Sequence, residues 1–180
     1  MENNLTNEAL DLFNKIKNPS EVNIIVLFNA CALLQTNEAL DLVKKVSREM
    51  PKSFYSNLRL VNSLLDALVK CDDVKQAESL FNRSRKKTLQ MYTTMMTGYN
   101  KANDPSKALD LFHQLKANGF ATDLIIYHCL MRSLTQLSDY ETSQKMVEEI
   151  PHPVLVDNQI RIALMNMWVS RKKCFSDAFQ

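Results

Sequence analysis

The chain has 180 residues and a formal net charge of +2, which allows one ordinary domain or an array of repeats. Hydrophobic residues make up 46% and charged residues 23%, as in a folded chain, yet only two glycines and five prolines occur. So few turn-forming residues argue against an all-β fold and favour long helices, and so small a charge does not by itself indicate nucleic-acid binding.

The first predicted element is a helix over Thr6–Lys17 that contains the phrase NEALDLF. An alanine or serine of this amphipathic phrase recurs from Ala9 to Ala178 at intervals of 30, 38, 31, 35 and 35 residues. Self-similarity at this spacing is the mark of a solenoid. The further copies are NEALDLV, KQAESLF, KALDLF and ETSQKMV, at Asn37–Val43, Lys75–Phe81, Lys107–Phe112 and Glu141–Val147.

Another predicted helix precedes each later copy, with a short polar break between the two. Each pair has an apolar stripe that it cannot bury alone, so neighbouring pairs must stack. The pattern predicts an all-α superhelix of helix-turn-helix repeats. These first helices are expected over Glu21–Leu34, Leu58–Lys70, Leu89–Lys101, Leu124–Gln136 and Asn158–Ser170.

Several helix ends carry local signals. Asp104 is placed to cap a helix that begins at Pro105, and Asn37 is expected to cap the second copy of the phrase. Gly119 follows HQLKAN, where a left-handed residue ends a helix. Two RKK clusters, Arg85–Lys87 and Arg171–Lys173, are also expected at helix ends.

The sulfur-containing residues are expected to fill the core. Cysteines at positions 31, 71, 129 and 174 form no C-x-x-C pair, so they indicate small reduced core residues and neither a zinc site nor a redox motif. The methionines at helical spacing are expected to be core filler. They are Met95, Met96, Met131, Met146, Met165 and Met167.

No enzymatic pattern is present in the sequence. His113, His128 and His152 are not in an H-x-E motif, and there is no glycine-rich phosphate loop or G-x-S-x-G. We therefore expect no catalysis, metal, cofactor or small-molecule substrate. The longest apolar stretch, Ile24–Leu34, is too short to cross a bilayer, so no membrane is expected as a partner. The opening MENNLTNEAL lacks the features of a secretory signal or a transit peptide.

The wording of the helix pairs resembles the pentatricopeptide repeat. Tyr92–Asp123 is similar to a whole repeat, Asn62–Phe81 resembles the short variant, and Glu21–Leu34 resembles the long variant. Such alternation resembles the subclass with long and short variants found in organellar RNA editing and processing factors. The resemblance implies a right-handed α-solenoid.

The resemblance also divides the chain into repeats. They are a partial repeat at 1–20, a long repeat at 21–57, a short repeat at 58–88, repeats at 89–123 and 124–157, and a partial repeat at 158–180. The chain opens on a second helix without its first and stops as CFSDAFQ begins another. It therefore looks like a piece of an array, or a short degenerate member of the family.

The nearest alternative is the tetratricopeptide repeat, which builds protein-binding scaffolds. It shares Ala-x-x-x-Phe, seen here at Ala77/Phe81 and Ala108/Phe112. The first helix of a tetratricopeptide repeat has the pattern W-x-x-L-G-x-x-Y, and no copy here contains it. Trp168 is not followed by the Leu-Gly pair that the pattern requires. The sequence motifs therefore favour the pentatricopeptide repeat, and a scaffold that binds protein partners remains the alternative.

The resemblance implies a groove for single-stranded RNA, in which each repeat reads one base with two or three side chains. Clamps beside the bases would be Val22, Arg59, Gln90 and Ile125, and Lys70 and Lys101 would meet phosphates. Both lysines also suit a helix C-terminus without any RNA. The implied reader pairs are Ile25 with Asn57, Asn62 with Thr88, Thr93 with Asp123, and His128 with Asp157, while Ile162 lacks a partner.

Base chemistry distinguishes these pairs. A carboxylate accepts from the N1–H and N2–H groups of guanine, so Thr93 with Asp123 is expected to favour guanine. The open alternative is that Asp123 only caps the helix that follows it. By analogy Asn62 with Thr88 leans to a pyrimidine, and Ile25 is expected to be non-selective.

The size of the array limits its affinity. Base stacking contributes about 1–3 kcal/mol per base, whereas association costs about 4–15 kcal/mol. Three or four repeats are therefore expected to bind RNA weakly unless a longer array or a partner adds to them. Family habit places such proteins in mitochondria or chloroplasts.

Overall fold

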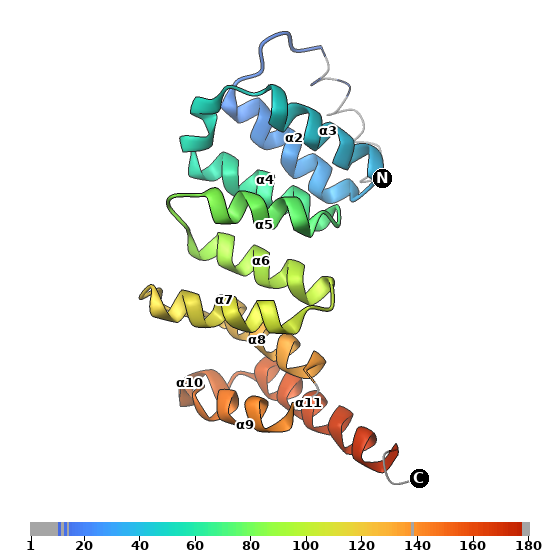
Figure 1. The fold of residues 1–180 in the computed structure, drawn as a ribbon, viewed down its shortest axis with the longest axis vertical. Coiled ribbons are helices and arrows are strands. Elements are labelled where there is room, and N and C mark those ends of the chain that lie inside the picture. The colour runs from blue at the N-terminus through green and yellow to red at the C-terminus, as the bar shows by residue number, and fades with distance from the viewer. Residues whose placement is uncertain (1–10, 12, 14, 138, 178–180) are drawn as a thin grey trace. The chain divides into compact units, whose positions relative to one another are not determined.

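The computed structural model describes residues 11, 13, 15–137 and 139–177, and every regular element in that part is helical (Figure 1). The chain divides into two compact units, residues 1–98 and 99–180, each of which is described by itself. Within the described ranges no helix is both long enough and apolar enough to cross a bilayer.

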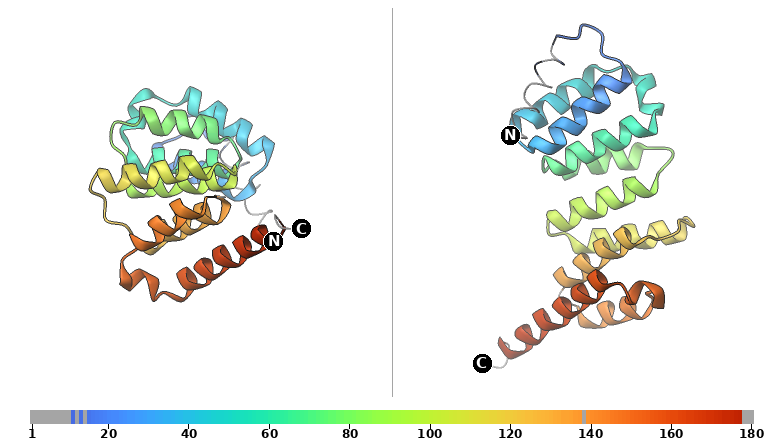
Figure 2. Two further views of the ribbon diagram at one scale, coloured as in Figure 1. Left: turned by 60° about the horizontal axis from the view of Figure 1, so that its bottom comes forward. Right: turned by 180° about the vertical axis from the view of Figure 1, so that it is seen from behind.

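The first unit contains two successive helix pairs and most of a further helix. α2 (Glu21–Leu34) pairs with α3 (Asn37–Glu49), and α4 (Leu58–Lys70) pairs with α5 (Val74–Arg83). α2 and α4 lie side by side, as both views of this unit show (Figures 1 and 2). α6 (Leu89–Lys101) follows, and its Tyr92 forms a T-shaped contact with Phe81, with ring centroids 5.2 Å apart.

A glycine lets α6 approach α4 closely. A Cβ added at Gly98 would lie 3.1 Å from both methyl carbons of Val69, whose side chain is buried. Valine is β-branched and has little freedom to turn away. The absence of a side chain at Gly98 therefore sets how near these two first helices lie.

The second unit repeats the same arrangement. After the end of α6 it contains α7 (Pro105–Ala117), α8 (Leu124–Gln136), α9 (Tyr140–Glu148), the one-turn α10 (His152–Leu155) and α11 (Asn158–Asp177). α8 packs against both α7 and α11. The core is apolar and aromatic, with buried Leu111, Phe112, Leu115, Tyr127, Leu130, Met131 and Ile160.

A polar cluster is buried inside the second unit. Asn100 donates its Nδ2 to the carbonyl of Cys129 at 2.9 Å and accepts from the hydroxyl of Ser133 at 2.8 Å. Gln136 donates its Nε2 to the carbonyl of Asn100 at 2.8 Å. These hydrogen bonds hold the end of α6 against α8 in one register.

The bounds of four first helices agree with the sequence prediction, and the fifth was wrong. α11 continues through Arg171–Lys173 to Asp177, although a break was expected after Ser170. Arginine and lysine are good helix formers, and no glycine or proline interrupts the segment, so nothing local stops the helix. The other RKK cluster, Arg85–Lys87, does lie just past the end of α5. Most of the helix expected over Thr6–Lys17 lies outside the described residues.

The predicted helix caps are mostly confirmed. Asp104 accepts from the backbone N–H of Lys107 at 3.3 Å before Pro105, and Gly119 has a φ of 74°. The prediction for Asn37 was wrong, because the cap is Thr36, whose hydroxyl accepts from the N–H of Ala39 at 3.2 Å. Thr36 has the extended backbone that a cap requires, whereas Asn37 is already helical.

The sequence analysis missed two short helical turns, α10 and the 3-10 helix η1 (Lys52–Ser56). Each follows a proline directly, at Pro51 and Pro151. The fixed φ of proline suits the start of a turn, so this was a readable signal. Both turns fill the longer connection between a second helix and the next first helix.

The prediction for the sulfur-containing residues is confirmed for Cys31, Cys71 and five of the methionines. Cys129 is only half-buried, and the side chain of Cys174 lies outside the described residues. Cys31 and Cys71 are buried free thiols, and burial raises the pKa of Cys31 to about 11. Met95, Met96, Met131, Met146 and Met167 are buried. Met165 is 66% exposed, so the core assignment was wrong there. Its face of α11 is not covered by the described part of the chain.

One ion pair ties α3 to the start of α5, and it makes a pH-dependent prediction. The Nζ of Lys44 lies 2.6 Å from the Oδ2 of Asp73. Burial alone would raise the pKa of Asp73, but the hydrogen bonds from Lys44 and from the N–H of Gln76 outweigh it, so the pKa is lowered. The charged form is therefore favoured by folding. That contribution is present above the unfolded pKa of ~3.9 and is lost as the pH falls through the lower folded value.

We predict that Asp73→Asn lowers the free energy of unfolding by about 0.5–1 kcal/mol at neutral pH, because asparagine keeps the cap but loses the ion pair. The difference from wild type should shrink as the pH falls through the lowered folded pKa of Asp73, because the carboxyl then becomes neutral in both states. Urea denaturation at several pH values measures both effects. Asp41→Asn, at an exposed position of α3, is the control. A difference that does not depend on pH would contradict the assignment.

Candidate nucleic-acid interface

Three of the predicted RNA-contacting residues meet in the first unit. The Nδ2 of Asn62 on α4 donates to the Oε1 of Gln90 on α6 at 3.1 Å. The hydroxyl of Thr88 donates to the Oδ1 of Asn62 at 3.2 Å. A predicted reader pair and the clamp of the next repeat therefore form one hydrogen-bonded cluster, although Gln90 lies 28 residues beyond Asn62.

This cluster fixes the orientation of the Asn62 amide. Once Thr88 and Gln90 are bonded, the amide still has its second N–H and one oxygen lone pair. Asn62 is half-buried, whereas Gln90 is exposed beside it. One donor and one acceptor of the amide therefore remain for a ligand. Their arrangement is already ordered before any ligand arrives.

All four closing residues of the predicted reader pairs cap the first helix that follows. Asp123 accepts through Oδ1 from the N–H of Ile126 at 2.9 Å, so this residue does cap α8. The bond uses one carboxylate oxygen and leaves the other in an exposed side chain. Capping therefore does not prevent ligand contact. The other three caps are Asn57 on α4, Thr88 on α6 and Asp157 on α11.

The remaining reader positions differ in what they present. The hydroxyl of Thr93 donates to the carbonyl of Leu89 at 3.0 Å, so only its acceptor lone pairs remain. Thr93 and Asp123 lie in different units, and each is described within its own. The amide of Asn57 donates to the carboxylate of Glu21 on α2, a partner that the sequence analysis missed.

The second unit contains the predicted reader pair His128 and Asp157. His128 is half-buried on α8, while Asp157 accepts from the N–H groups of Gln159 and Ile160 at 3.0 Å. In the described part of the chain no hydrogen bond joins His128 to Asp157. Ile162 on α11 is exposed and offers only an apolar surface.

The predicted clamps are all exposed. Val22 is 67% exposed and Ile125 is 59% exposed, which is unusual for large aliphatic residues. Arg59 and Gln90 are exposed at the equivalent positions of α4 and α6. Each of these side chains occupies the second residue of its helix, so each is available to an approaching ligand.

Both lysines predicted to contact phosphates lie at the end of a first helix. The Nζ of Lys70 lies 2.9 Å from the Oδ2 of Asp66 one turn earlier on α4, so a phosphate would have to share it with a carboxylate. Lys101 is exposed at the end of α6. The carboxylate of Asp66 is a feature that the sequence analysis missed, although its i, i+4 spacing from Lys70 was visible.

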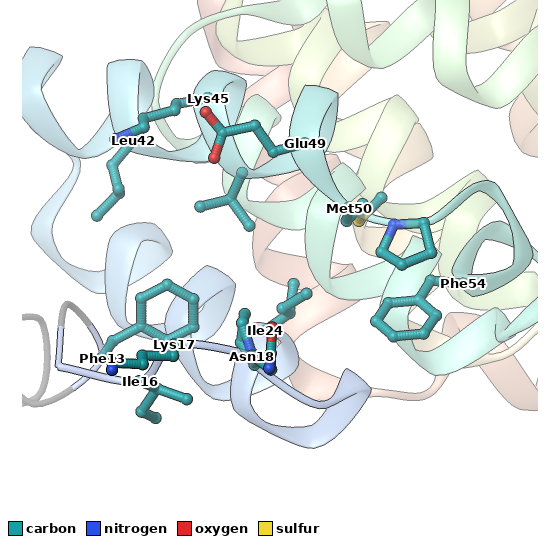
Figure 3. A pocket seen from close by; sticks show the side chains of 13 residues that line it. Phe13, Ile16, Lys17, Asn18, Ile24, Leu42, Lys45, Glu49, Met50 and Phe54 are labelled. Atoms are coloured by element: carbon teal, nitrogen blue, oxygen red, sulfur yellow. The ribbon is translucent and has the colours of Figure 1, made fainter.

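A separate pocket lies beside α2 and α3, with a volume of about 590 Å³. Phe13, Ile16, Leu42 and Phe54 line it, and Lys45 and Glu49 stand at its edge (Figure 3). None of the predicted base readers or clamps is among its lining residues. Apolar and charged side chains both line this pocket, which is distinct from the predicted RNA-binding positions.

Comparison with known proteins agrees with this arrangement. A family model for the PPR repeat matches residues 60–89 and 90–120, which cover most of α4 and the helices α5 to α7. The chain carries pentatricopeptide repeats. The likeness to curated proteins of Arabidopsis thaliana extends over most of the chain.

Three relatives show how similar this pentatricopeptide-repeat chain is to these proteins. Pentatricopeptide repeat-containing protein At1g11290, chloroplastic, is 28% identical over 77% of this chain and 17% of its own length. Pentatricopeptide repeat-containing protein DOT4, chloroplastic, is 31% identical over 72% of this chain and 15% of its own length. Pentatricopeptide repeat-containing protein At4g19191, mitochondrial, is 26% identical over 91% of this chain and 25% of its own length. The chain thus spans a quarter or less of the length of these relatives.

A solved structure shows the same fold. The pentatricopeptide repeat protein PPR10, crystallised in complex with an 18-nt psaJ RNA element, aligns with a TM-score of 0.59 and 19% identity. The alignment covers 87% of this chain and 23% of PPR10. The predicted fold class, an all-α solenoid of helical repeats, is confirmed.

Because Asp123 caps α8, its variants should separate capping from ligand contact. We predict that Asp123→Ala lowers the free energy of unfolding by about 1 kcal/mol, since the N–H of Ile126 loses its partner. Asp123→Asn should change it by only a few tenths of that, because asparagine caps as well as aspartate. Urea denaturation compares the two, and equal losses in both variants would contradict a capping role.

Proposed function

We propose that this pentatricopeptide-repeat chain binds single-stranded RNA along its first helices, with one base per repeat and no chemistry of its own. The hydrogen-bonded cluster of Asn62, Thr88 and Gln90 carries the proposal, because it brings a reader pair and a clamp together. PPR10 was crystallised with RNA bound, and the likeness of its fold to this chain supports the same role. The exposed clamps at Val22, Arg59 and Ile125 would lie against base faces.

The proposed base preferences follow from the groups left free. The oxygen of Thr93 and the second oxygen of Asp123 both act as acceptors, which complements the N1–H and N2–H donors of guanine. Adenine presents an acceptor there and would face the carboxylate unpaired. The leftover donor and acceptor of Asn62 suit a pyrimidine edge. His128 with Asp157 is assigned as a reader pair without a stated base.

The biological setting is part of the same proposal. The relatives' names place them in chloroplasts or mitochondria, which supports an organellar role in RNA processing or editing. The subclass with alternating long and short repeats is proposed from the wording of the repeats, with the boundaries 21–57, 58–88, 89–123 and 124–157. At a few repeats, the affinity of this chain alone is expected to be low.

A protein-binding role is the second candidate, and one observation favours it. Val22, Val26 and Leu33 form an apolar stripe on α2, with exposed fractions of 67%, 54% and 71%. Exposed apolar stripes of this kind often bind proteins. An interaction that survives nuclease treatment and high salt would favour this role over RNA binding.

We predict that oligonucleotides carrying guanine at the position read by Thr93 and Asp123 bind better than their adenine counterparts, and that Asp123→Asn removes this preference. The expected change is about 5-fold to 150-fold, which corresponds to about 1–3 kcal/mol for one good paired contact. Fluorescence anisotropy with oligonucleotides that scan a single guanine through a uridine background gives the measurement, at two salt concentrations.

The matched control is Asp41→Asn, which makes the same change at an exposed position of a second helix. It should leave binding unaltered. Binding that responds neither to salt nor to Asp123→Asn would contradict the proposed function.

A further inference from the structure

An open groove lies in the second unit between α8 and α11, with a volume of about 350 Å³. His128, Arg132, Thr135 and Gln136 line it from α8, and Asn166 lines it from α11. The spacing of His128, Arg132 and Gln136 is one helical turn each, so they form a single row along α8. The groove therefore begins at a predicted base reader and continues along the helix.

The charge of this groove is positive. Arg132 is exposed, and among the described residues no carboxylate or other acceptor pairs with its guanidinium. None of the residues that line the groove carries a carboxylate. An anion that entered would meet a guanidinium whose donors are still available.

Comparison with the equivalent positions of the other first helices shows how Arg132 differs from them. The last residue of the first helix is Lys70 on α4 and Lys101 on α6, but on α8 the equivalent residue is the uncharged Gln136. One turn earlier, the equivalent of Arg132 is Asp66 on α4 and Thr97 on α6. On α8 the positive charge therefore lies one turn closer to the start of the helix than on α4 and α6, and on the same face.

Gln136 does not replace the lysine as a group that binds an anion, because its amide is held inside the unit. Its Nε2 donates to the carbonyl of Asn100 at 2.8 Å, which directs the amide into the polar cluster inside the unit. Its Oε1 is buried and has no hydrogen-bond partner within the described part of the chain. Gln136 therefore forms the floor of the groove, and Arg132 is left as the group that reaches solvent.

We propose that Arg132 binds a backbone phosphate of single-stranded RNA in this groove, next to the base held at His128. The inference rests on the proposed function and extends it to a residue outside the reader, clamp and lysine positions. Guanidinium binds phosphate through two parallel N–H···O bonds, and this geometry fixes the phosphate more firmly than an ammonium does. Arg132 thereby replaces the lysine that α8 lacks.

The test uses the full chain and a fluorescent pool of random-sequence single-stranded RNA oligonucleotides, titrated between ~50 and ~200 mM salt. Arg132→Ala is expected to weaken binding on the order of tenfold at the lower salt. It should also reduce the slope of log K against log salt by ~0.7, which is the value for one phosphate contact on a single strand. Arg132→Lys should keep most of the slope.

The matched control is Arg161→Ala, which removes the same charge from an exposed position of α11 outside the groove. It should change affinity less than about twofold. Equal losses from Arg132→Ala and Arg161→Ala would overturn the site, because they would mean diffuse attraction. Unchanged binding and salt slope in Arg132→Ala, with a wild type that binds, would overturn this inference and leave the proposed function standing. A wild type that does not bind the pool overturns both.

Discussion

The start of each first helix is the constraint on which the proposed interface depends. The first turn of a helix leaves N–H groups without partners, and here the closing residue of the preceding repeat supplies the acceptor. Asn57, Thr88, Asp123 and Asp157 all do so. A cap must be a short polar side chain, and short polar side chains are also the groups that recognise base edges. One physical demand therefore restricts these positions to residues that are suited to both tasks.

The cap also orders the group that would meet RNA. A free aspartate or threonine would lose rotamer freedom on binding, whereas a capping side chain has already lost it on folding. In the first unit this order extends across three residues, because Thr88 caps α6 and also holds Asn62, which in turn holds Gln90. The same two helices, α4 and α6, also approach closely at Gly98.

The sequence predicted features that depend on neighbouring residues. Asp104 before Pro105 and Gly119 after HQLKAN mark helix ends by their own backbone preferences, and both are confirmed. The cap of α3 was predicted wrongly because two neighbouring residues could each have capped the helix. Thr36 and Asn37 are both good caps, and only the backbone geometry selects Thr36. The cluster of Asn62, Thr88 and Gln90 joins neighbouring repeats, so composition and periodicity alone could not have placed its hydrogen bonds.

The central claim is that RNA lies along the first helices, and the side-chain amides offer a direct measurement of it. A nitrogen–proton correlation spectrum of the full chain, recorded as single-stranded RNA is added, reports on Asn62 of α4 and on Asn82, which is exposed on the second helix α5. The account predicts that the amide resonances of Asn62 and Gln90 shift with RNA concentration while that of Asn82 stays in place. Shifts at Asn82 with Asn62 and Gln90 unmoved would contradict it.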